Sequence, residues 1–274
     1  MTTVEQPAVR VAQGSLVAGV DVGGTKVAAL VVDDTGQVRG KAVRPMADRS
    51  HGGVEPIVGA VKAALAEAGA GTESLRAIGI GVPGRIDARA GIVNLATNLG
   101  WRDLPLAALI EDQLGVATSV ENDVGLAAAG LVRHPVAEGA RSLAYVAVGT
   151  GIGAGLVLNG RLYQGDHGMA GEIGHVIVVA DGIECRCGQH GCLETIASGP
   201  HIARRAAEAL QERGTEADRI LRAGDPITAK TVYEAAAAAE PIASAIATET
   251  GAFLARSVAG LMFTCDLDLV LLGG

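Results

Sequence analysis

The sequence is poor in aromatic residues and has no excess of positive charge. Its 274 residues include one Trp, three Tyr and two Phe, so the aromatic platforms on which nucleic-acid bases stack are scarce. A net charge of −8 does not attract a phosphate backbone or an anionic membrane surface. The composition therefore argues against nucleic acids and membranes as partners.

Long apolar runs are also missing. The first fourteen residues contain Glu5, Pro7 and Arg10 and no apolar core, so we expect no signal peptide. Residues 142–160 are uncharged, but they contain five glycines and alternate with a period of two around Gly149-Thr150-Gly151. This pattern predicts a buried β-hairpin rather than a bilayer helix. We expect a soluble, cytoplasmic protein.

Glycine is abundant instead. The 39 glycines are about twice the usual share of ~7%, and they cluster beside apolar runs, which is typical of loops that approach a ligand closely. At ~150 residues per domain, the length fits one large domain or two ordinary ones.

Two segments of the chain resemble each other. Residues 17–36 and 143–160 each predict a strand, a glycine turn, a second strand and a polar turn, and an offset of 126 residues superimposes Val22 on Val148. Such a long offset indicates a duplicated domain, with a glycine hairpin on each side of a cleft. Helices and strands alternate after each hairpin, which is typical of the α/β class. We place the domains at 1–130 and 131–274.

The remaining elements follow from periodicity and from helix start and stop signals. A helix over 104–114 is expected to be capped by Asp103 and ended by Gly115. The other expected helices cover 56–68, 124–132, 201–213, 228–239 and 242–264, and further strands cover 75–82, 116–120 and 267–272.

The two glycine turns are candidate phosphate sites. The segment from Asp21 to Lys26 is a tight turn whose glycines let backbone amides approach an anion, although an ordinary hairpin turn is the alternative. Gly149-Thr-Gly-Ile-Gly153 starts like a dinucleotide fingerprint, but a strand and not a helix follows it. Together the turns indicate a polyphosphate held from two sides.

Glu121-Asn122-Asp123 follows a predicted strand and opens a predicted helix. Asp and Asn are preferred N-caps, so one interpretation is a helix cap. The other is a carboxylate at a strand end, placed to accept a proton from a hydroxyl.

Three of the four cysteines lie within eight residues. Cys185, Cys187 and Cys192 offer three soft ligands, and His175 or His190 could supply the fourth of a zinc site. Three buried thiols are the alternative. Cys265 stands alone on an apolar helix and is expected in the core.

Several motifs follow one another along the chain. They are Asp21-Val-Gly-Gly-Thr-Lys26, Asn98-Leu-Gly-Trp101, Glu121-Asn-Asp123, Val148-Gly-Thr-Gly-Ile-Gly-Ala-Gly155, Gly171-Glu-Ile-Gly-His175 and Cys185-Arg-Cys-Gly-Gln-His-Gly-Cys-Leu-Glu194. In this order they resemble the ROK family (repressors, open reading frames and sugar kinases), especially its bacterial glucokinase branch. The resemblance covers Val17 to Gly274.

The resemblance implies a fold and a reaction. The fold is the duplicated, ribonuclease H-like fold of actin-like ATPases, with two domains around a cleft. The reaction is ATP-dependent phosphorylation of a hexose, with glucose as the first candidate; another hexose or an N-acetylhexosamine is the alternative, as is a sugar-binding module without turnover. An intact Asp123 argues against the last, because a sensor does not need a base.

The resemblance also assigns residues. Asp123 matches the catalytic base, and Mg²⁺ would accompany ATP. The sugar would be bound by Asn98, Asn122, Asp123, Glu172, His175 and Glu194. ATP would be bound by Asp21, Gly23, Gly24, Thr25, Lys26, Thr150, Gly151, Gly153, Gly273 and Gly274. A structural Zn²⁺ would be held by His175, Cys185, Cys187 and Cys192.

The chain departs from the family pattern at three places. Gly125 stands where glucokinase-like members usually carry Asn, which bears on the preference for glucose. Only twenty residues precede Asp21, too few for the winged helix of the family's repressors. The chain stops at Gly273-Gly274, so we expect the second domain to lack the family's closing helices. The family further implies a homo-oligomer, a dimer or a tetramer.

Overall fold

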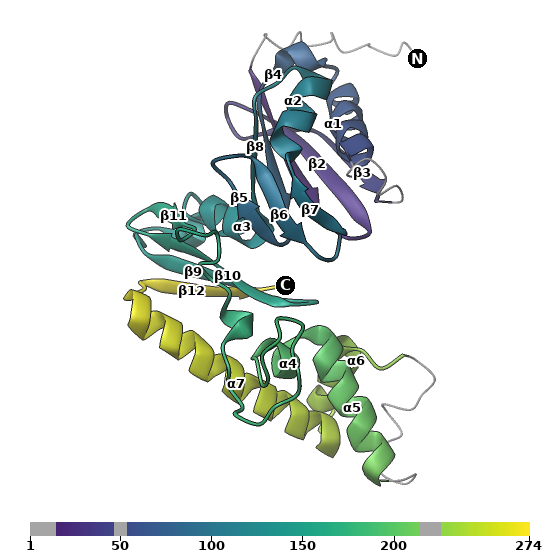
Figure 1. Cartoon of the computed structure of the whole chain (residues 1–274), viewed down its shortest axis with the longest axis vertical. Helices are drawn as coiled ribbons and strands as arrows, with labels where there is room; N and C mark the ends of the chain where they lie inside the picture. Colours follow the sequence, from purple (N-terminus) through teal and green to yellow (C-terminus); the bar gives the residue numbers. More distant parts are fainter. Residues whose placement is uncertain (1–14, 47–53, 214–225) are drawn as a thin grey trace, which may run out of the picture. The chain divides into compact units, whose positions relative to one another are not determined.

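The computed structural model describes residues 15–46, 54–213 and 226–274 (Figure 1). The predicted absence of a signal peptide concerns residues 1–14, which lie outside this range. The chain forms two compact units. Of the described residues, those up to Leu126 belong to unit 1 together with Asp166–Gly168, and the others belong to unit 2. The boundary between units falls inside one helix, α3 (Asp123–Leu131).

Unit 1 is built on a five-stranded sheet with the order β3-β2-β1-β4-β8. Its strands are β1 (Leu16–Val22), β2 (Lys26–Asp33), β3 (Val38–Pro45), β4 (Leu75–Val82) and β8 (Thr118–Asn122). The first three strands are antiparallel, whereas β4 and β8 run parallel to β1. The carboxyl ends of β1, β4 and β8 therefore lie at one edge of the sheet.

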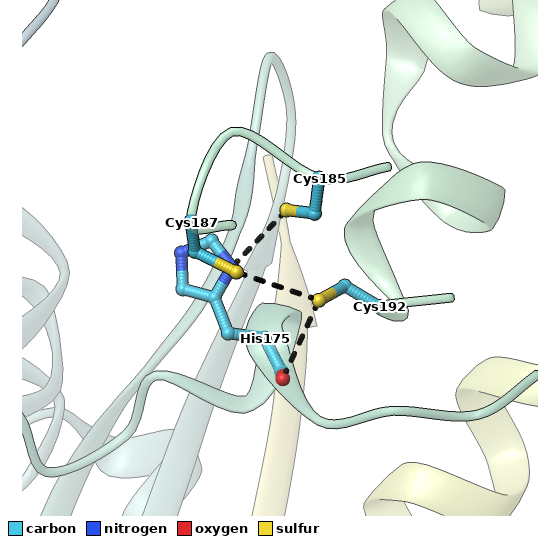
Figure 2. A group of neighbouring side chains, drawn as sticks. All are labelled: His175, Cys185, Cys187 and Cys192. Atoms are coloured by element: carbon cyan, nitrogen blue, oxygen red, sulfur yellow. Dashed lines mark hydrogen bonds between the residues drawn. The ribbon is translucent and has the colours of Figure 1, made fainter. Parts of the chain in front are cut away.

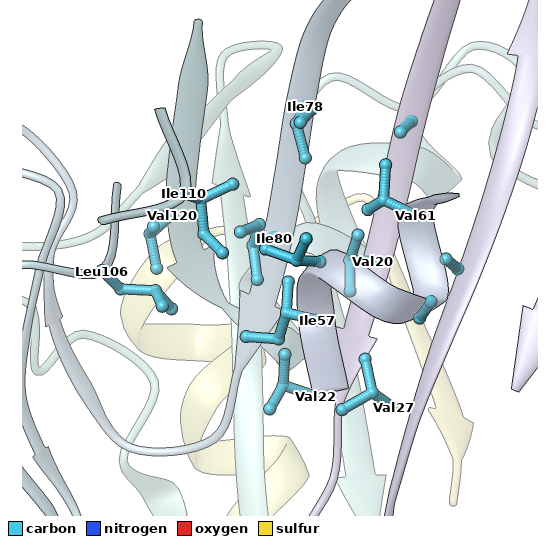
Figure 3. Packing of buried hydrophobic residues seen from close by; sticks show 14 of the residues in the cluster. Val20, Val22, Val27, Ile57, Val61, Ile78, Ile80, Leu106, Ile110 and Val120 are labelled. Atoms are coloured by element: carbon cyan, nitrogen blue, oxygen red, sulfur yellow. The ribbon is translucent and has the colours of Figure 1, made fainter. Parts of the chain in front are cut away.

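Two helices of unit 1 supply apolar side chains to the core of this sheet. They are α1 (Val54–Glu67) and α2 (Leu106–Leu114). Ile57 of α1 and Ile110 of α2 are completely buried among strand residues such as Ile80 (Figure 3). Burying an aliphatic side chain contributes about 1.5–3 kcal/mol, so this shared core fixes the strands whose ends carry the candidate site.

The start of α2 differs from the sequence prediction. Asp103 is not a cap: it has a φ of +47° and belongs to β7 (Trp101–Leu104), while Pro105 occupies the N-cap position. The reason is that a residue before proline is disfavoured in helical conformation, so Leu104 cannot open the helix. The predicted end is confirmed, since Gly115 is left-handed at φ +67° and its N–H bonds to the carbonyl of Glu111.

A small antiparallel sheet in unit 1 was not predicted. It consists of β5 (Arg85–Asp87), β6 (Ile92–Ala96) and β7. A 3₁₀ turn, η2 (Thr72–Ser74), precedes β4. These strands have only three to five residues, and β5 and β7 carry charged side chains, so none of them shows a long apolar run or a clear alternation.

Unit 2 repeats most of the topology of unit 1. Its sheet has the order β11-β10-β9-β12, made of β9 (Leu143–Val148), β10 (Ile152–Leu158), β11 (Arg161–Tyr163) and β12 (Leu269–Gly273). Val148 pairs with Ile152 across the turn as Val22 pairs with Val27, and β12 runs parallel to β9 as β4 does to β1. The predicted hairpin is confirmed, and none of the described helices is long and apolar enough to cross a membrane.

Three helices of unit 2 lie within three residues of their predicted bounds: α5 (Gly199–Arg213), α6 (Ala229–Ala237) and α7 (Pro241–Cys265). The short η3 (Pro135–Ala137), η4 (Ile173–His175) and α4 (Glu194–Ala197) were not predicted. In α7, Ile242 and Ile246 pack with α5 and α6, whereas Val258 and Leu261 pack against the sheet core. Cys265 ends α7, partly buried against that core.

Candidate functional site

Two carboxylates of unit 1 lie at the carboxyl ends of parallel strands. Asp21 is near the end of β1 and Asp123 directly follows β8, with β4 between them. Gly81 of β4 lies next to the second: a Cβ built on it would be 3.4 Å from the Cα of Asp123, an ordinary van der Waals contact. The start of α3 therefore packs directly against the middle strand.

The helix cap of α3 is Asn122. Its Oδ1 accepts a hydrogen bond from the N–H of Gly125 at 3.0 Å, and its Nδ2 donates to the carbonyl of Gly84 at 3.1 Å. Asp123 occupies the first helical position, where Oδ1 accepts from the N–H of Val124 at 2.9 Å. Capping therefore accounts for Asn122, and the carboxylate of Asp123 is not the cap of this helix.

The environment of Asp123 makes its carboxylate more basic. Burial raises the pKa of Asp123 above its ordinary value of 3.8, and the negative charge of Asp21 raises this pKa further, while the N–H of Val124 opposes the shift. A carboxylate with a raised pKa is a better proton acceptor as long as it stays ionised at the working pH.

The first glycine turn joins β1 to β2. The N–H of Gly23 donates to the carbonyl of Lys26 at 2.9 Å and closes the turn, which leaves Thr25 exposed. A Cβ on Gly24 would lie 3.8 Å from the carbonyl oxygen of Asn98. Unit 1 therefore brings the turn, Asn98 and the two carboxylates to one edge.

The second glycine turn joins β9 to β10 in unit 2. The N–H of Gly149 donates to the carbonyl of Gly151 at 2.9 Å, and Thr150 is exposed. Gly273 pairs with Ala147, and a Cβ on Gly274 would lie 2.2 Å from the carbonyl oxygen of Val148. The predicted nucleotide residues of unit 2 therefore gather at the ends of β9 and β12, with Gly153 within β10.

Four potential metal ligands meet in unit 2 (Figure 2). The ligand atoms of His175, Cys185, Cys187 and Cys192 all lie within 4.8 Å of one another. Sγ of Cys185 is 3.6 Å from Nδ1 of His175, and Sγ of Cys187 is 3.6 Å from Sγ of Cys192. His190 is exposed, forms an isolated backbone β-bridge with Glu184 and lies outside the group of ligands.

This group fits a tetrahedral metal. Zinc bound by sulfur at ~2.3 Å and by nitrogen at ~2.0–2.1 Å separates ligand atoms in a tetrahedron by roughly 3.6–3.8 Å, close to the two 3.6 Å distances. Three soft sulfurs and one imidazole are also donors that zinc prefers.

The thiols differ in how readily they lose a proton. Burial raises the pKa of Cys185 and raises that of Cys192 to about 12, whereas the backbone N–H of Gln189 lowers the pKa of Cys187. Binding a cation would therefore displace protons from two buried thiols.

His175 faces different partners with its two ring nitrogens. Nδ1 points toward Cys185, and Nε2 lies 3.8 Å from Oε2 of Glu172. The side chains of His175 and Glu172 are 31% and 40% exposed, so solutes can reach this pair.

Glu194 is bonded to the strand that leaves the second turn. Its Oε2 accepts from the N–H of Ile152 at 2.9 Å. The preceding residues, Cys192 and Leu193, are completely buried and anchor it. Sequence reasoning missed this bond because no local pattern links positions 42 residues apart. It also missed the 2.8 Å contact between the buried Ser198 and Nδ1 of His201.

Comparison of the sequence with known families and proteins gives one consistent result. The profile described as "ROK family" matches residues 17–274. The glucokinase of Halalkalibacterium halodurans is 34% identical over 260 residues, which cover 93% of this chain and 79% of that protein. An N-acetylmannosamine kinase of Yersinia pseudotuberculosis is 30% identical over 256 residues, covering 93% and 81%.

Solved structures agree with the sequence relatives. A ROK hexokinase from Thermus thermophilus has a TM-score of 0.79 at 33% identity, covering 94% of this chain and 82% of that one. A ROK family glucokinase from Streptomyces griseus, in complex with glucose and AMPPNP, has a TM-score of 0.78 at 34% identity, covering 94% and 83%.

Proposed function

The chain belongs to the ROK family, has the actin-like ATPase fold and is an ATP-dependent sugar kinase, and from this premise we propose that it phosphorylates glucose on the 6-hydroxyl. The observation that carries the proposed mechanism is the placement of Asp123. Because Asn122 caps α3, the more basic carboxylate of Asp123 keeps Oδ2 for a substrate hydroxyl.

The proposed chemical step is an in-line phosphoryl transfer. The 6-hydroxyl oxygen forms a bond to the γ-phosphorus of ATP while the bond from that phosphorus to the bridging oxygen breaks, and ADP leaves with that electron pair. Asp123 accepts the hydroxyl proton as the attack proceeds. The protein contributes mainly alignment and charge neutralisation, which is what this reaction requires.

The two glycine turns are proposed to hold the phosphates. Backbone N–H groups of such turns, that of Gly151 among them, would donate to phosphate oxygens, and Lys26 adds a positive charge. Oxygen donors such as Asp21 suit Mg²⁺, which supplies charge neutralisation at the phosphates when it is bound with ATP.

The sugar residues are proposed to select hydroxyl groups. Asn98, Asn122 and Asp123 of unit 1 and Glu172 and Glu194 of unit 2 would each bond to a hydroxyl. Polar groups left unpaired by a sugar that lacks the matching hydroxyl would disfavour its binding. This arrangement accounts for discrimination between sugars of similar size.

We assign zinc to the cysteine cluster, with a structural role. Three thiolates and Nδ1 of His175 would supply the four ligands of a structural zinc site, which would leave no position for a metal-bound water. Nε2 of His175 is then left to bind the sugar beside Glu172. The zinc would thus fix the orientation of a sugar-binding ring.

An N-acetylhexosamine is the second candidate substrate, because an N-acetylmannosamine kinase is among the relatives. Gly125, where glucokinase-like members usually carry Asn, bears on the choice between glucose and an N-acetylhexosamine. We further propose a cytoplasmic location, where ATP is available. A homo-oligomer, dimer or tetramer, stays a prediction from the family.

A coupled assay of ADP release over a panel of hexoses and N-acetylhexosamines tests the substrate. We expect the highest kcat/KM with glucose, and we expect the product to be oxidised by a dehydrogenase specific for glucose 6-phosphate. A higher kcat/KM with N-acetylmannosamine would reject glucose in favour of the second candidate.

A further inference from the structure

The backbone of Ile152 connects the second glycine turn to the proposed sugar residues. Its N–H donates to Oε2 of Glu194 at 2.9 Å. Its carbonyl oxygen would lie 2.2 Å from a Cβ on Gly174, within the segment that carries Glu172 and His175. The first residue of β10 is thus in close contact with Glu194 and with the segment that carries Glu172 and His175.

Gly151 is fitted to the same carboxylate. A Cβ built on Gly151 would lie 2.7 Å from Oε2 of Glu194, so a methyl group there would require this flexible carboxylate to move away. A Cβ on Gly149, in the same turn, would meet nothing within 4 Å. Neither glycine has a positive φ, so the two positions differ in the space available and not in backbone strain.

We propose that Gly151 and the N–H of Ile152 are positioning groups for the sugar: they hold Oε2 of Glu194 so that Oε1 is presented to a sugar hydroxyl. The proposal rests on the proposed function, in which Glu194 binds the sugar. It gives the second glycine turn a role in sugar binding that does not depend on ATP. Oε1 has no hydrogen bond among the described residues, in agreement with this role.

Oε1 and Oε2 of Glu194 can have different roles because each oxygen accepts hydrogen bonds of its own. An ionised carboxylate has two acceptor oxygens, and a bond from a backbone N–H to one of them fixes the direction of the other. Without that bond Glu194 would exchange between side-chain rotamers, and the sugar would have to order it on binding. The backbone of the turn therefore supplies the pre-organisation.

Sugar binding in the absence of nucleotide tests the proposal. Glucose is titrated calorimetrically into the zinc-loaded protein and into the variants Gly151→Ala and Gly149→Ala. We expect Gly151→Ala to weaken glucose binding about 10-fold or more, as loss of a hydrogen bond to a charged group does, and Gly149→Ala to leave it within about twofold. Equal binding by wild type and Gly151→Ala would overturn the proposal.

A double variant separates displacement of Glu194 from general damage. Glu194→Asp withdraws the carboxylate by one methylene and leaves space for a methyl group at position 151. We expect Glu194→Asp to weaken glucose binding, and Gly151→Ala added to it to cause no further loss, because the two changes act on one contact. Additive losses would overturn the proposal even if Gly151→Ala alone were poorly stable.

Failure of the proposed function gives a different result. If Glu194→Ala left glucose binding unchanged, the sugar role of Glu194 would be wrong, and this inference with it. If Glu194→Ala abolished binding while Gly151→Ala kept the wild-type affinity, only the inference would be rejected. Zinc content and unfolding temperature are measured for each variant to establish that it is folded.

Discussion

At the scale of single residues, Asn122 and Asp123 divide two functions that the sequence could not separate. Both are good N-cap residues, and pattern alone favoured a cap. The structure assigns the cap to Asn122 through the N–H of Gly125. The decisive facts, the position of the first helical residue and the proximity of Asp21, depend on how β1, β4 and β8 assemble, which local sequence does not contain.

Replacing the proposed base should remove catalysis and spare binding. Asp123→Asn keeps the shape of the side chain and loses the proton acceptor, so we expect kcat to fall about 10²–10⁴-fold with little change in glucose affinity. ADP-release kinetics and calorimetry measure the two effects. A variant that kept near-wild-type kcat would reject Asp123 as the base.

The same variant has a predicted effect on stability. Because the pKa of Asp123 is raised in the folded protein, ionisation destabilises the fold as the pH rises through this pKa. Asn carries no charge, so Asp123→Asn should unfold at the same or a higher temperature than wild type at pH 7. A clear loss of thermal stability would contradict this expectation.

The raised pKa also predicts the pH dependence of activity. The reaction needs the ionised carboxylate, so kcat/KM should fall as the pH decreases through a pKa above the ordinary 3.8. Asp21→Asn removes a charge that raises this pKa and should shift the acidic limb to lower pH, whatever its effect on the maximal rate. Zinc content is followed over the same range. An unshifted or upward-shifted limb would contradict the assignment.

At the scale of elements, regular patterns were predictable and short or long-range features were not. The hairpin around Gly149 and the strand β4 were predicted because each combines an apolar run with clear glycine signals. The sheet β5-β6-β7 was missed because its strands have only three to five residues. The contact between Glu194 and Ile152 was missed because it joins positions far apart in sequence.

The start of α3 offers a test that separates capping from sugar binding. Asn122→Ser keeps a good N-cap residue but loses the amide, so we expect near-wild-type thermal stability and weaker glucose binding. Asn122→Ala loses both, and its unfolding free energy should fall by about 1 kcal/mol. If both variants bound glucose like wild type, Asn122 would be a cap only.

The metal cluster predicts one zinc per chain. Metal analysis after Cys192→Ser should find the zinc lost, since a buried ligand has been removed. His175→Ala should weaken both zinc and glucose binding, whereas the matched variant His190→Ala should leave zinc content unchanged because His190 lies outside the cluster. Loss of zinc in His190→Ala but not in His175→Ala would move the fourth ligand into the cysteine loop.

At the scale of the whole molecule, the internal repeat recognised from two glycine hairpins extends to strand order. In both units a third antiparallel strand pairs with the second strand of the hairpin, and a parallel strand pairs with the first. The sequence contained the hairpins because turns and alternation are local signals. The parallel pairing of β12 with β9 spans more than a hundred residues and became visible only in the structure.

The proposed sugar residues are distributed over both units, which leads to a prediction for hydrogen exchange. If all of them bind the same sugar, adding glucose should slow amide exchange in residues 118–125 of unit 1 and in 171–175 and 192–197 of unit 2. Ligand at 100 times its Kd adds about 2.7 kcal/mol of stability, so the effect is measurable. Protection confined to one unit would assign the sugar to that unit alone.

The two-sided placement of His175, with Nδ1 toward the cysteines and Nε2 toward Glu172, has a consequence for the cell. If the cluster holds zinc as proposed, the affinity of the enzyme for sugar depends on the supply of zinc in the cell. Starvation for zinc would then slow the phosphorylation of sugar even while ATP and sugar remain plentiful.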